Sequence, residues 1–247
     1  MIIFLINISV MFDELSVIIP LHNKAHSIKN TVNKLSSSNL FTKLQIIIVE
    51  NESTDNSLDI AKDIAKSYVK KNNIEIKILK SSKGKGNAIR KGIPEIKFKW
   101  CLITGADLPF GLSDIKNILK EKEINYDLYL GSKAHPKSNI ERKFSRVVYS
   151  FIFLLFRKVF LKLDYLDTHG SMIIKSKYLK SISHLLTQEQ FFIDTEIVFL
   201  VNKLNIGIKE VPIILEFDDQ LTTVRPLKDG AHILFETIKL GVKKNQS

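Results

Sequence analysis

The 247-residue sequence has little of what marks several common classes of protein. Its one cysteine, Cys101, excludes a disulfide framework and a cysteine-based metal cluster, and it suits a reducing compartment. Glycine contributes only 10 residues and proline 6, whereas apolar residues make up 45%, which excludes collagen-like repeats and disorder. No apolar run reaches the roughly 20 residues that a membrane-spanning helix needs. What remains is a globular chain long enough for one large domain or two small ones.

The first ten residues are apolar but lack the basic start and the small-residue cleavage site of a signal peptide. We interpret them as an extra strand or a frayed segment, with a weak membrane contact as the alternative. Met11 is a second candidate start of the chain.

Basic charge is concentrated in one part of the chain. The net charge is +11, and between Lys133 and Leu163 the only acidic residue is Glu141. The basic residues of this segment are Lys133, Lys137, Arg142, Lys143, Arg146, Arg157, Lys158 and Lys162. They flank an apolar run over residues 147–156, a composition typical of a helix that lies on an anionic membrane surface. A buried core helix with solvated basic ends is the alternative. No nucleic-acid-binding motif is present, so nucleic acid is not an expected partner.

Short apolar runs alternate with amphipathic segments, which predicts an α/β domain with a largely parallel sheet. The predicted strands are 16–20, 45–49, 74–79, 100–104, 127–130, 172–174 and 207–215, the last broken by Pro212. The predicted helices are 24–35, 55–68, 84–93, 191–204 and 226–242. Right-handed crossovers place the carboxyl ends of parallel strands at one edge, where ligands bind.

Polar segments follow four of these strands: His22-Asn23, Glu50–Ser53, Lys83–Asn87 and Gly105–Asp107. Glycines let backbone amides approach a phosphate, and a following helix N-terminus favours an anion. Neither the G-x-x-x-x-G-K-[ST] nor the G-x-G-x-x-G phosphate loop is present. Each segment alone fits an ordinary surface turn equally well, whereas the four in order are informative.

In this order the segments resemble the motifs of the inverting family 2 glycosyltransferases of GT-A fold. Val17–Asn23 is similar to the family's opening VIIPxxN strand, Val49–Asp55 to VDDGSTD, Gly84–Gly92 to GKGxAxxxG, and Gly105–Leu108 to DADL. Within the family the chain looks most like the branch that makes dolichyl- or polyprenyl-phosphate hexoses. The features of that branch are Ser145-Arg146, Asp167–Met172, Phe192–Glu196 and Thr222–Leu227, and the resemblance covers Leu15 to Leu240.

The resemblance implies a Rossmann-like GT-A fold, with a mostly parallel sheet flanked by helices and a C-terminal amphipathic helical elaboration. We expect one domain over 1–247, with a nucleotide-sugar half at about 15–131 and an acceptor and membrane-surface half at about 132–247. The implied reaction transfers a hexose, with inversion, from a nucleotide-diphosphate sugar to a polyprenyl phosphate such as dolichyl or undecaprenyl phosphate. The implied location is cytoplasmic, peripherally bound to the cytoplasmic face of the membrane. The alternatives are a sugar-hydroxyl acceptor in cell-envelope polysaccharide assembly and a non-catalytic nucleotide-sugar-binding homologue.

The resemblance also implies roles for individual residues. The expected catalytic residues are Asp107, Arg146 and Asp194, with Asp194 a natural general base if the acceptor were a sugar hydroxyl. The expected nucleotide-sugar site contains Pro20, Leu21, His22, Glu50, Ser53, Lys83, Gly84, Lys85, Gly86, Gly105, Ala106 and Asp107. The expected contacts to the acceptor phosphate are Lys133, Arg142, Arg146 and Arg225.

The sequence departs from the family pattern at the expected metal site. Asp107 is the implied ligand of Mg²⁺ or Mn²⁺, but Gly105 stands where the family's first motif aspartate does. An ion held mostly by substrate phosphates and water tolerates one protein carboxylate, so the metal requirement stays open. Lys24 replaces the usual acidic residue after the first-strand asparagine, and Glu50 and Glu52 replace an aspartate and a glycine. The donor base and sugar are therefore not inferred.

Overall fold

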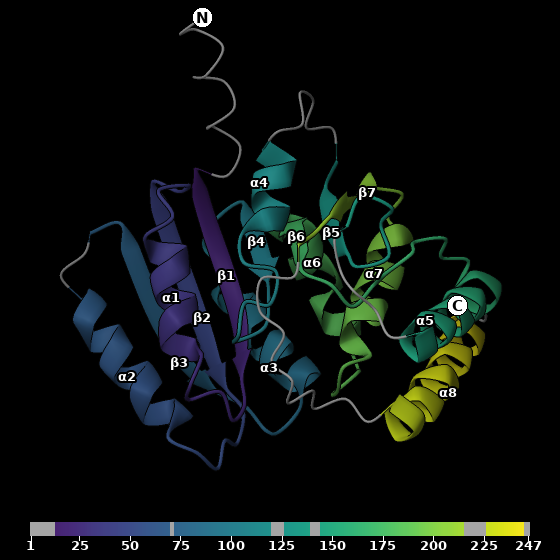
Figure 1. Cartoon of the computed structure of the whole chain (residues 1–247), viewed down its shortest axis with the longest axis horizontal. Helices are drawn as coiled ribbons and strands as arrows, with labels where there is room; N and C mark the ends of the chain where they lie inside the picture. The colour runs from purple at the N-terminus through teal and green to yellow at the C-terminus, as the bar shows by residue number, and fades with distance from the viewer. Residues whose placement is uncertain (1–12, 70–71, 120–125, 139–143, 215–225, 245–247) are drawn as a thin grey trace, which may run out of the picture.

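The computed structural model describes residues 13–69, 72–119, 126–138, 144–214 and 226–244 (Figure 1). The first-ten-residue segment discussed above lies outside this part of the chain. The strands are β1 (Glu14–Leu21), β2 (Lys43–Glu50), β3 (Ile74–Lys80), β4 (Trp100–Ile103), β5 (Leu128–Ser132), β6 (Met172–Lys175) and β7 (Ile208–Pro212). The α-helices are α1 (Ile28–Ser36), α2 (Ser57–Tyr68), α3 (Lys85–Gly92), α4 (Ser113–Leu119), α5 (Phe144–Phe156), α6 (Ser176–Ile182), α7 (Ile193–Asn202) and α8 (Pro226–Lys244).

The seven strands form one sheet in the order β3-β2-β1-β4-β6-β5-β7. All neighbouring pairs are parallel except those of β6, which runs antiparallel to both β4 and β5. Leu21 pairs with Glu50 and Ile18 with Ile103, so β1, β2 and β4 end at the same edge. The predicted, largely parallel sheet is confirmed.

Helices cover both faces of this sheet because residues of the central strands alternate between two apolar clusters. Val17 and Ile19 of β1 pack with residues of α1, α2 and α4. Ile18 packs on the opposite face with residues of α3, α6 and α7. Near-continuous apolar runs are therefore what buried parallel strands require, which explains why β1 and β2 were visible in the sequence.

Two helices were not predicted, and both are short. α4 and α6 have seven residues each, about two turns, which is too few to display a helical apolar period. The last predicted strand is shorter than expected, because β7 ends at Pro212, where proline removes a backbone donor.

The end of the molecule far from α2 and β3 is built by α5 and α8, which lie side by side (Figure 1). α5 continues into a π-helical turn over Arg157–Leu161, which ends at Lys162 in a left-handed conformation (φ 55°). α8 approaches this turn so closely that a Cβ on Gly241 would lie 2.5 Å from the carbonyl oxygen of Phe160. Within the described ranges, no helix has both the length and the apolar character that crossing a membrane requires.

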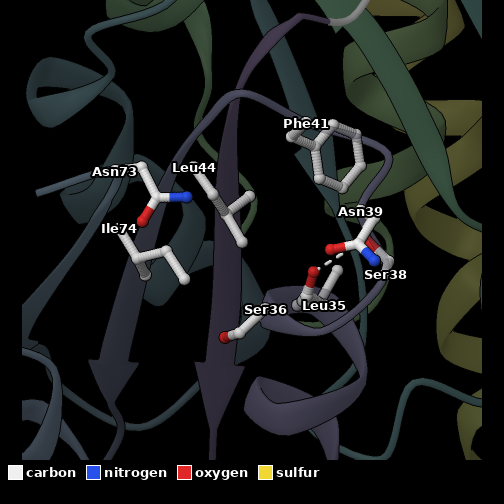
Figure 2. A pocket seen from close by; sticks show the side chains of 8 residues that line it. All are labelled: Leu35, Ser36, Ser38, Asn39, Phe41, Leu44, Asn73 and Ile74. Carbon is white, nitrogen blue, oxygen red and sulfur yellow. Dashed lines mark hydrogen bonds between the residues drawn. The ribbon is translucent and has the colours of Figure 1, made fainter. Parts of the chain in front are cut away.

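A small hollow lies at the edge of the sheet where β2 and β3 begin, opposite the edge at which β1, β2 and β4 end (Figure 2). Its lining includes Leu44 and Ile74 from those strands, Leu35 from the end of α1, and Phe41. It faces the amino ends of the parallel strands, whereas ligands of such sheets bind at the carboxyl ends. The candidate site is therefore built elsewhere, from the loops that follow β1 to β4.

Candidate active site

The loops after β1 and β2 form one hydrogen-bonded unit. The amide of Thr54 donates to Asn23 Oδ1 (2.7 Å), and the amide of Asn23 donates to Ser53 Oγ (3.2 Å). Asn23 has a φ of 50°, a left-handed conformation that asparagine tolerates better than most residues. His22 Nδ1 donates to the carbonyl of Asn51 at 2.8 Å. The expected nucleotide-site residues His22 and Ser53 are thus brought together.

The other expected residues of these two strand ends are largely occupied within the protein. The side chain of Leu21 is fully buried, so only its backbone borders the edge, next to Pro20. Glu50 is buried as well, and its Oε1 accepts a hydrogen bond from the amide of Ser53 at 2.6 Å. Contacts of Pro20, Leu21 and Glu50 with a nucleotide stay predictions.

Asn51 joins the loop after β2 to the loop after β3. Its side-chain amide donates to the carbonyl of Gly84 (2.9 Å), and its Oδ1 accepts from the amide of Gly84 (2.7 Å). The residue is only 2% exposed, so both bonds are shielded from water. The sequence motif contained Asn51, but local spacing gave no sign of this bridge.

Gly84 and Gly86 allow their loop to pack closely against the backbone of a second loop. A Cβ on Gly84 would lie 2.3 Å from the carbonyl oxygen of Glu189, and one on Gly86 would lie 2.1 Å from that of Gln188. Gly84 also has a φ of +129°, which side chains rarely adopt. The amide of Gly86 donates to Glu189 (2.7 Å). The resemblance led us to expect that the Gly84 and Gly86 amides bind a diphosphate. In this structure both amides instead donate to protein acceptors.

The two lysines of this loop differ. Lys83 is exposed, and the described part of the structure assigns its ammonium no partner. Lys85 Nζ lies 2.5 Å from Asp194 Oδ2 in the first turn of α7, and His169 Nδ1 lies 3.7 Å from the same oxygen. Burial raises the pKa of Asp194, but Lys85 and His169 outweigh it, so the pKa lies below its ordinary value. Asp194 is therefore an ionised, paired carboxylate.

Asp107 lies in the turn after β4, and α1 fixes the backbone of that turn. The carbonyl of Ala106 accepts hydrogen bonds from Ser27 Oγ (3.2 Å) and Thr31 Oγ1 (2.8 Å). Lys24, just before α1, places its Nζ 3.0 Å from Asp107 Oδ2. The sequence showed Lys24 only as a departure from the family pattern. Its pairing with a residue 83 positions away was missed because nothing local signals it.

Among the residues that the structure describes, those around Asp107 do not fit a metal ion held by protein side chains. Gly105 contributes no carboxylate, and the carboxylate of Asp107 is paired with Lys24. In the described ranges, no three His, Cys, Asp or Glu side chains gather where they could hold a metal ion. Hard cations such as Mg²⁺ and Mn²⁺ favour several oxygen ligands, so this turn offers them little.

The antiparallel direction of β6 brings a further loop to this edge, because β6 starts where its neighbours end. A Cβ on Gly170 would lie 1.6 Å from the carbonyl oxygen of Gly131, so the loop packs directly against β5. Ser171 Oγ donates to the buried carboxylate of Asp114 at the start of α4. The loop from Asp167 to Ser171 is thus a fixed part of the site.

Among the expected acceptor-phosphate residues, Lys133 is the one whose side chain the structure describes. Its Nζ donates to the carbonyl of His169 (3.2 Å) and lies 3.6 Å from Asp167 Oδ2. Burial raises the pKa of Asp167, but Lys133 and His169 together bring it below its ordinary value. Arg142 and Arg225 lie outside the described residues, as does the side chain of Arg146, although its backbone belongs to α5.

Comparison with known proteins agrees with this arrangement. The model of the family described as Glycosyl transferase family 2 matches residues 16–182. A dolichyl-phosphate beta-glucosyltransferase of Dictyostelium discoideum is 27% identical over 260 residues, covering 94% of this chain and 77% of the relative. A protein of the same name from Saccharomyces cerevisiae is 29% identical over 221 residues, covering 81% of this chain and 66% of the relative.

Solved structures share the fold. Glucosyl-3-phosphoglycerate synthase from Mycobacterium tuberculosis in complex with UDP has a TM-score of 0.63 at 15% identity, covering 94% of this chain and 82% of that chain. The same enzyme with Mn²⁺, UDP and glucosyl-3-phosphoglycerate has a TM-score of 0.64 at 15% identity, covering 93% of this chain and 79% of that chain. The expected GT-A-like architecture is confirmed. The chain belongs to glycosyl transferase family 2 and is a glycosyltransferase.

Proposed function

We propose that this enzyme transfers a hexose from a nucleotide-diphosphate sugar to a polyprenyl phosphate, with inversion at the anomeric carbon. The observation that carries the proposal is the likeness to two dolichyl-phosphate beta-glucosyltransferases. In the Dictyostelium relative it covers 94% of this chain, well beyond the family match that ends at residue 182. Glucose, the sugar in both names, is the sugar that we expect, and the UDP-bound structural relative supports a uridine donor.

The charges at the site favour a phosphate acceptor over a sugar hydroxyl. A phosphate monoester is mostly dianionic at pH 7, so it attacks the anomeric carbon without a general base. A hydroxyl acceptor needs such a base, and Asp194 suits that role poorly because Lys85 neutralises its carboxylate at 2.5 Å. We assign Asp194 the role of holding Lys85 and His169 in place. Lys83 is free to reach the donor diphosphate, and Lys133, with Arg142, Arg146 and Arg225, is expected to hold the acceptor phosphate.

A lipid acceptor also requires contact with a membrane surface, and α5 and α8 offer one. Their exposed apolar side chains, which we call the apolar face, are Val148, Phe151, Ile152, Leu155 and Val159 from α5 and its π-helical turn, and Phe235, Ile238 and Val242 from α8. These residues are exposed, so the run in α5 is not a buried core helix. The sequence predicted a membrane-surface half at about 132–247 and pointed to the apolar run in α5, and α8 adds exposed apolar side chains of its own.

Basic residues border the apolar face, as anionic lipid requires. Lys158, Lys162 and Lys239 are exposed on the elements that carry it. Arg157 corrects the expectation from sequence, because it is buried and its Nη2 donates to the carbonyls of Tyr165 and Leu166 at 3.2 Å. We propose that the apolar face inserts into the surface of the membrane, on the cytoplasmic side.

A transfer assay tests the reaction. Purified enzyme is incubated with undecaprenyl or dolichyl phosphate in detergent and with radiolabelled UDP-glucose, UDP-galactose, UDP-N-acetylglucosamine or GDP-mannose, in EDTA, Mg²⁺ or Mn²⁺. We expect acid-labile label in the organic phase from UDP-glucose. No lipid product from any donor, despite nucleotide binding, would contradict the proposal and favour a sugar acceptor or a non-catalytic role.

Two lysine variants distinguish a specific loss of acceptor binding from a general loss of activity. Lys133→Gln is expected to raise KM for the polyprenyl phosphate about tenfold, as loss of one charge-assisted contact does, with KM for the sugar donor unchanged. Lys137→Gln is the matched control, since Lys137 lies exposed in the same loop. Equal kinetics of the two variants would remove Lys133 from the acceptor site.

A further inference from the structure

We propose that the ammonium of Lys24 occupies the position of a divalent cation at Asp107, bridges this carboxylate to the donor diphosphate, and allows transfer without a metal ion. This inference rests on the proposed function, because it assumes a nucleotide-diphosphate donor. It assigns Lys24 a direct role in holding the leaving group. It also distinguishes this chain from the Mn²⁺-bound glucosyl-3-phosphoglycerate synthase that shares its fold.

The first observation is the pair itself. Lys24 Nζ stands 3.0 Å from Asp107 Oδ2, where a cation bound to that oxygen would otherwise be. The side chains are 17% and 19% exposed, so the pair is neither a loose surface contact nor sealed from a ligand. An ammonium carries three N–H donors, so it can bind a carboxylate and a phosphate oxygen at the same time.

The second observation is that the backbone fixes both partners before any donor binds. The amide of Lys24 donates to Ser57 Oγ (2.9 Å), and its carbonyl accepts from the amides of Ser27 and Ile28 (3.1 Å each). Ser27 and Thr31 in turn hold the carbonyl of Ala106, next to Asp107. The start of α1 therefore holds Lys24 and the Asp107 turn in fixed positions relative to each other. Preorganised charge of this kind stabilises a transition state at little reorganisation cost.

The third observation is that the Asp107 turn itself supplies no second carboxylate. Gly105 has no side chain, and a Cβ built on it would lie 2.7 Å from Asp107 Oδ1. A divalent ion here would thus take one carboxylate from this turn and would face the positive charge of Lys24. The same residues suit an ammonium, which needs one counter-charge and a few acceptors.

The chemistry balances without a proton transfer. An oxygen of the acceptor phosphate forms a bond to the anomeric carbon from the face opposite the leaving group. The bond from that carbon to the diphosphate oxygen breaks, and its electron pair leaves on the diphosphate. Lys24 stays protonated throughout and stabilises the charge that develops on the leaving oxygens.

The first test compares wild type and variants in EDTA, with two readouts: UDP binding by calorimetry and transfer to polyprenyl phosphate. We expect wild type to bind UDP in EDTA and to transfer hexose at a rate within about twofold of that in Mn²⁺. Lys24→Gln should bind UDP at least tenfold more weakly and lose about 100-fold in kcat, the size of effect that follows removal of one preorganised donor. Lys29→Gln is the matched control, because Lys29 lies exposed in the first turn of α1, shortly after Lys24 in the chain.

The second test rebuilds a metal site. In the double variant Lys24→Glu with Gly105→Asp, two further carboxylates join Asp107. We expect this variant to bind Mn²⁺, seen as loss of the free-ion signal in electron paramagnetic resonance, whereas wild type leaves the signal unchanged. Any transfer that the variant retains should disappear in EDTA.

These outcomes separate the inference from the proposed function. Wild-type transfer that EDTA abolishes and Mn²⁺ restores would overturn the role of Lys24 and leave the proposed reaction standing. UDP affinity in EDTA that is equal in wild type and folded Lys24→Gln would overturn it too. Absence of any lipid product would contradict the proposed reaction alone, because the UDP affinities and the Mn²⁺ signals still decide whether Lys24 replaces the metal.

Discussion

The two parts of the sheet are built on different principles. From β1 to β4, parallel strands alternate with helices, and the loops at their carboxyl edge are tied together by side-chain to backbone bonds such as those of Asn51. From β5 to α8, an antiparallel strand, a π-helical turn and an exposed apolar face interrupt that regularity. Under the proposed function, the first part would bind the small charged donor and the second part would contact the membrane surface.

The two parts contact each other at identifiable points of the site. The Gly84–Gly86 loop packs on the carbonyls of Gln188 and Glu189, and Lys85 pairs with Asp194. Substitutions at these points should impair the binding of both the donor and the acceptor. Substitutions in the apolar face should impair only binding to the membrane and its lipid acceptor. The following variants, from the largest expected effect to the smallest, test this contrast.

The largest effect is expected from Gly86→Ala, which forces the Gly84–Gly86 loop away from the backbone of Gln188 and Glu189. Its Cβ would lie 2.1 Å from the backbone oxygen of Gln188, a contact that only a backbone shift relieves. We expect the free energy of unfolding in urea to fall by about 3 kcal/mol and kcat/KM to fall about 100-fold. Gly92→Ala in the same helix is the control, because there the Cβ meets only the side chain of Ile18 at 3.1–3.3 Å. Similar losses in both variants would contradict the special role of the loop contact.

Asn51→Ala should weaken the first part of the sheet edge alone. It removes both bonds to Gly84 and leaves a buried amide without its acceptor, which costs about 2 kcal/mol in unfolding experiments. Asn56→Ala is the control, since Asn56 is exposed at the start of α2 and makes no side-chain capping bond. If the two variants unfold alike, Asn51 does not hold the loops together.

Asp194→Asn tests the ion pair between the two parts and has a defined pH dependence. The folded pKa of Asp194 is depressed, so its stabilisation is present above the unfolded pKa of about 3.9 and is lost as the pH falls through the folded value. We expect the variant to be about 2 kcal/mol less stable than wild type at pH 7, with the gap narrowing below about pH 4. A gap that persists unchanged at pH 2 would show that the carboxylate charge is not the cause. Asp59→Asn, at an exposed pair on α2, is the control.

The smallest effect on stability, and a selective effect on binding, is expected from Phe151→Glu combined with Phe235→Glu. These side chains are 58% and 62% exposed, so the free energy of unfolding should stay within about 0.5 kcal/mol of wild type. Partitioning onto vesicles that contain phosphatidylglycerol should fall at least tenfold, since burial of one Phe contributes about 1.5–3 kcal/mol. Val69→Glu is the control, because Val69 is 80% exposed at the end of α2. An equal loss in the control would mean that added charge, not the apolar face, governs binding.

The sequence predicted the first part of the molecule better than the second. β1 and β2 are apolar runs with polar ends, and buried parallel strands impose that pattern locally. The direction of β6 was not predictable, because an antiparallel strand between two parallel ones has the same apolar composition. The helices α4 and α6 were missed because their stability comes from packing on the sheet and not from a visible period.

The position of several candidate residues at one edge of the sheet was predictable, but their contacts were not. Motif order brought His22, Ser53 and Asp107 to one edge, and the structure places them there. Whether an amide or an ammonium is already engaged depends on residues far away in the chain, such as Glu189 for Gly86 and Lys24 for Asp107. Such long-range partners leave no trace in local spacing.

The position of β6 in the sheet has a consequence for biosynthesis. β4 ends at Ile103, but the strand that covers its free side is finished only at Lys175. At about 5–20 residues per second, a ribosome needs roughly 4–14 seconds to make the intervening chain. During that time the nascent polypeptide exposes the unpaired backbone groups of an edge strand, which are a template for wrong partners. Translation speed between these two strands, and the chaperones present while it proceeds, should therefore govern how much of this enzyme reaches its native state.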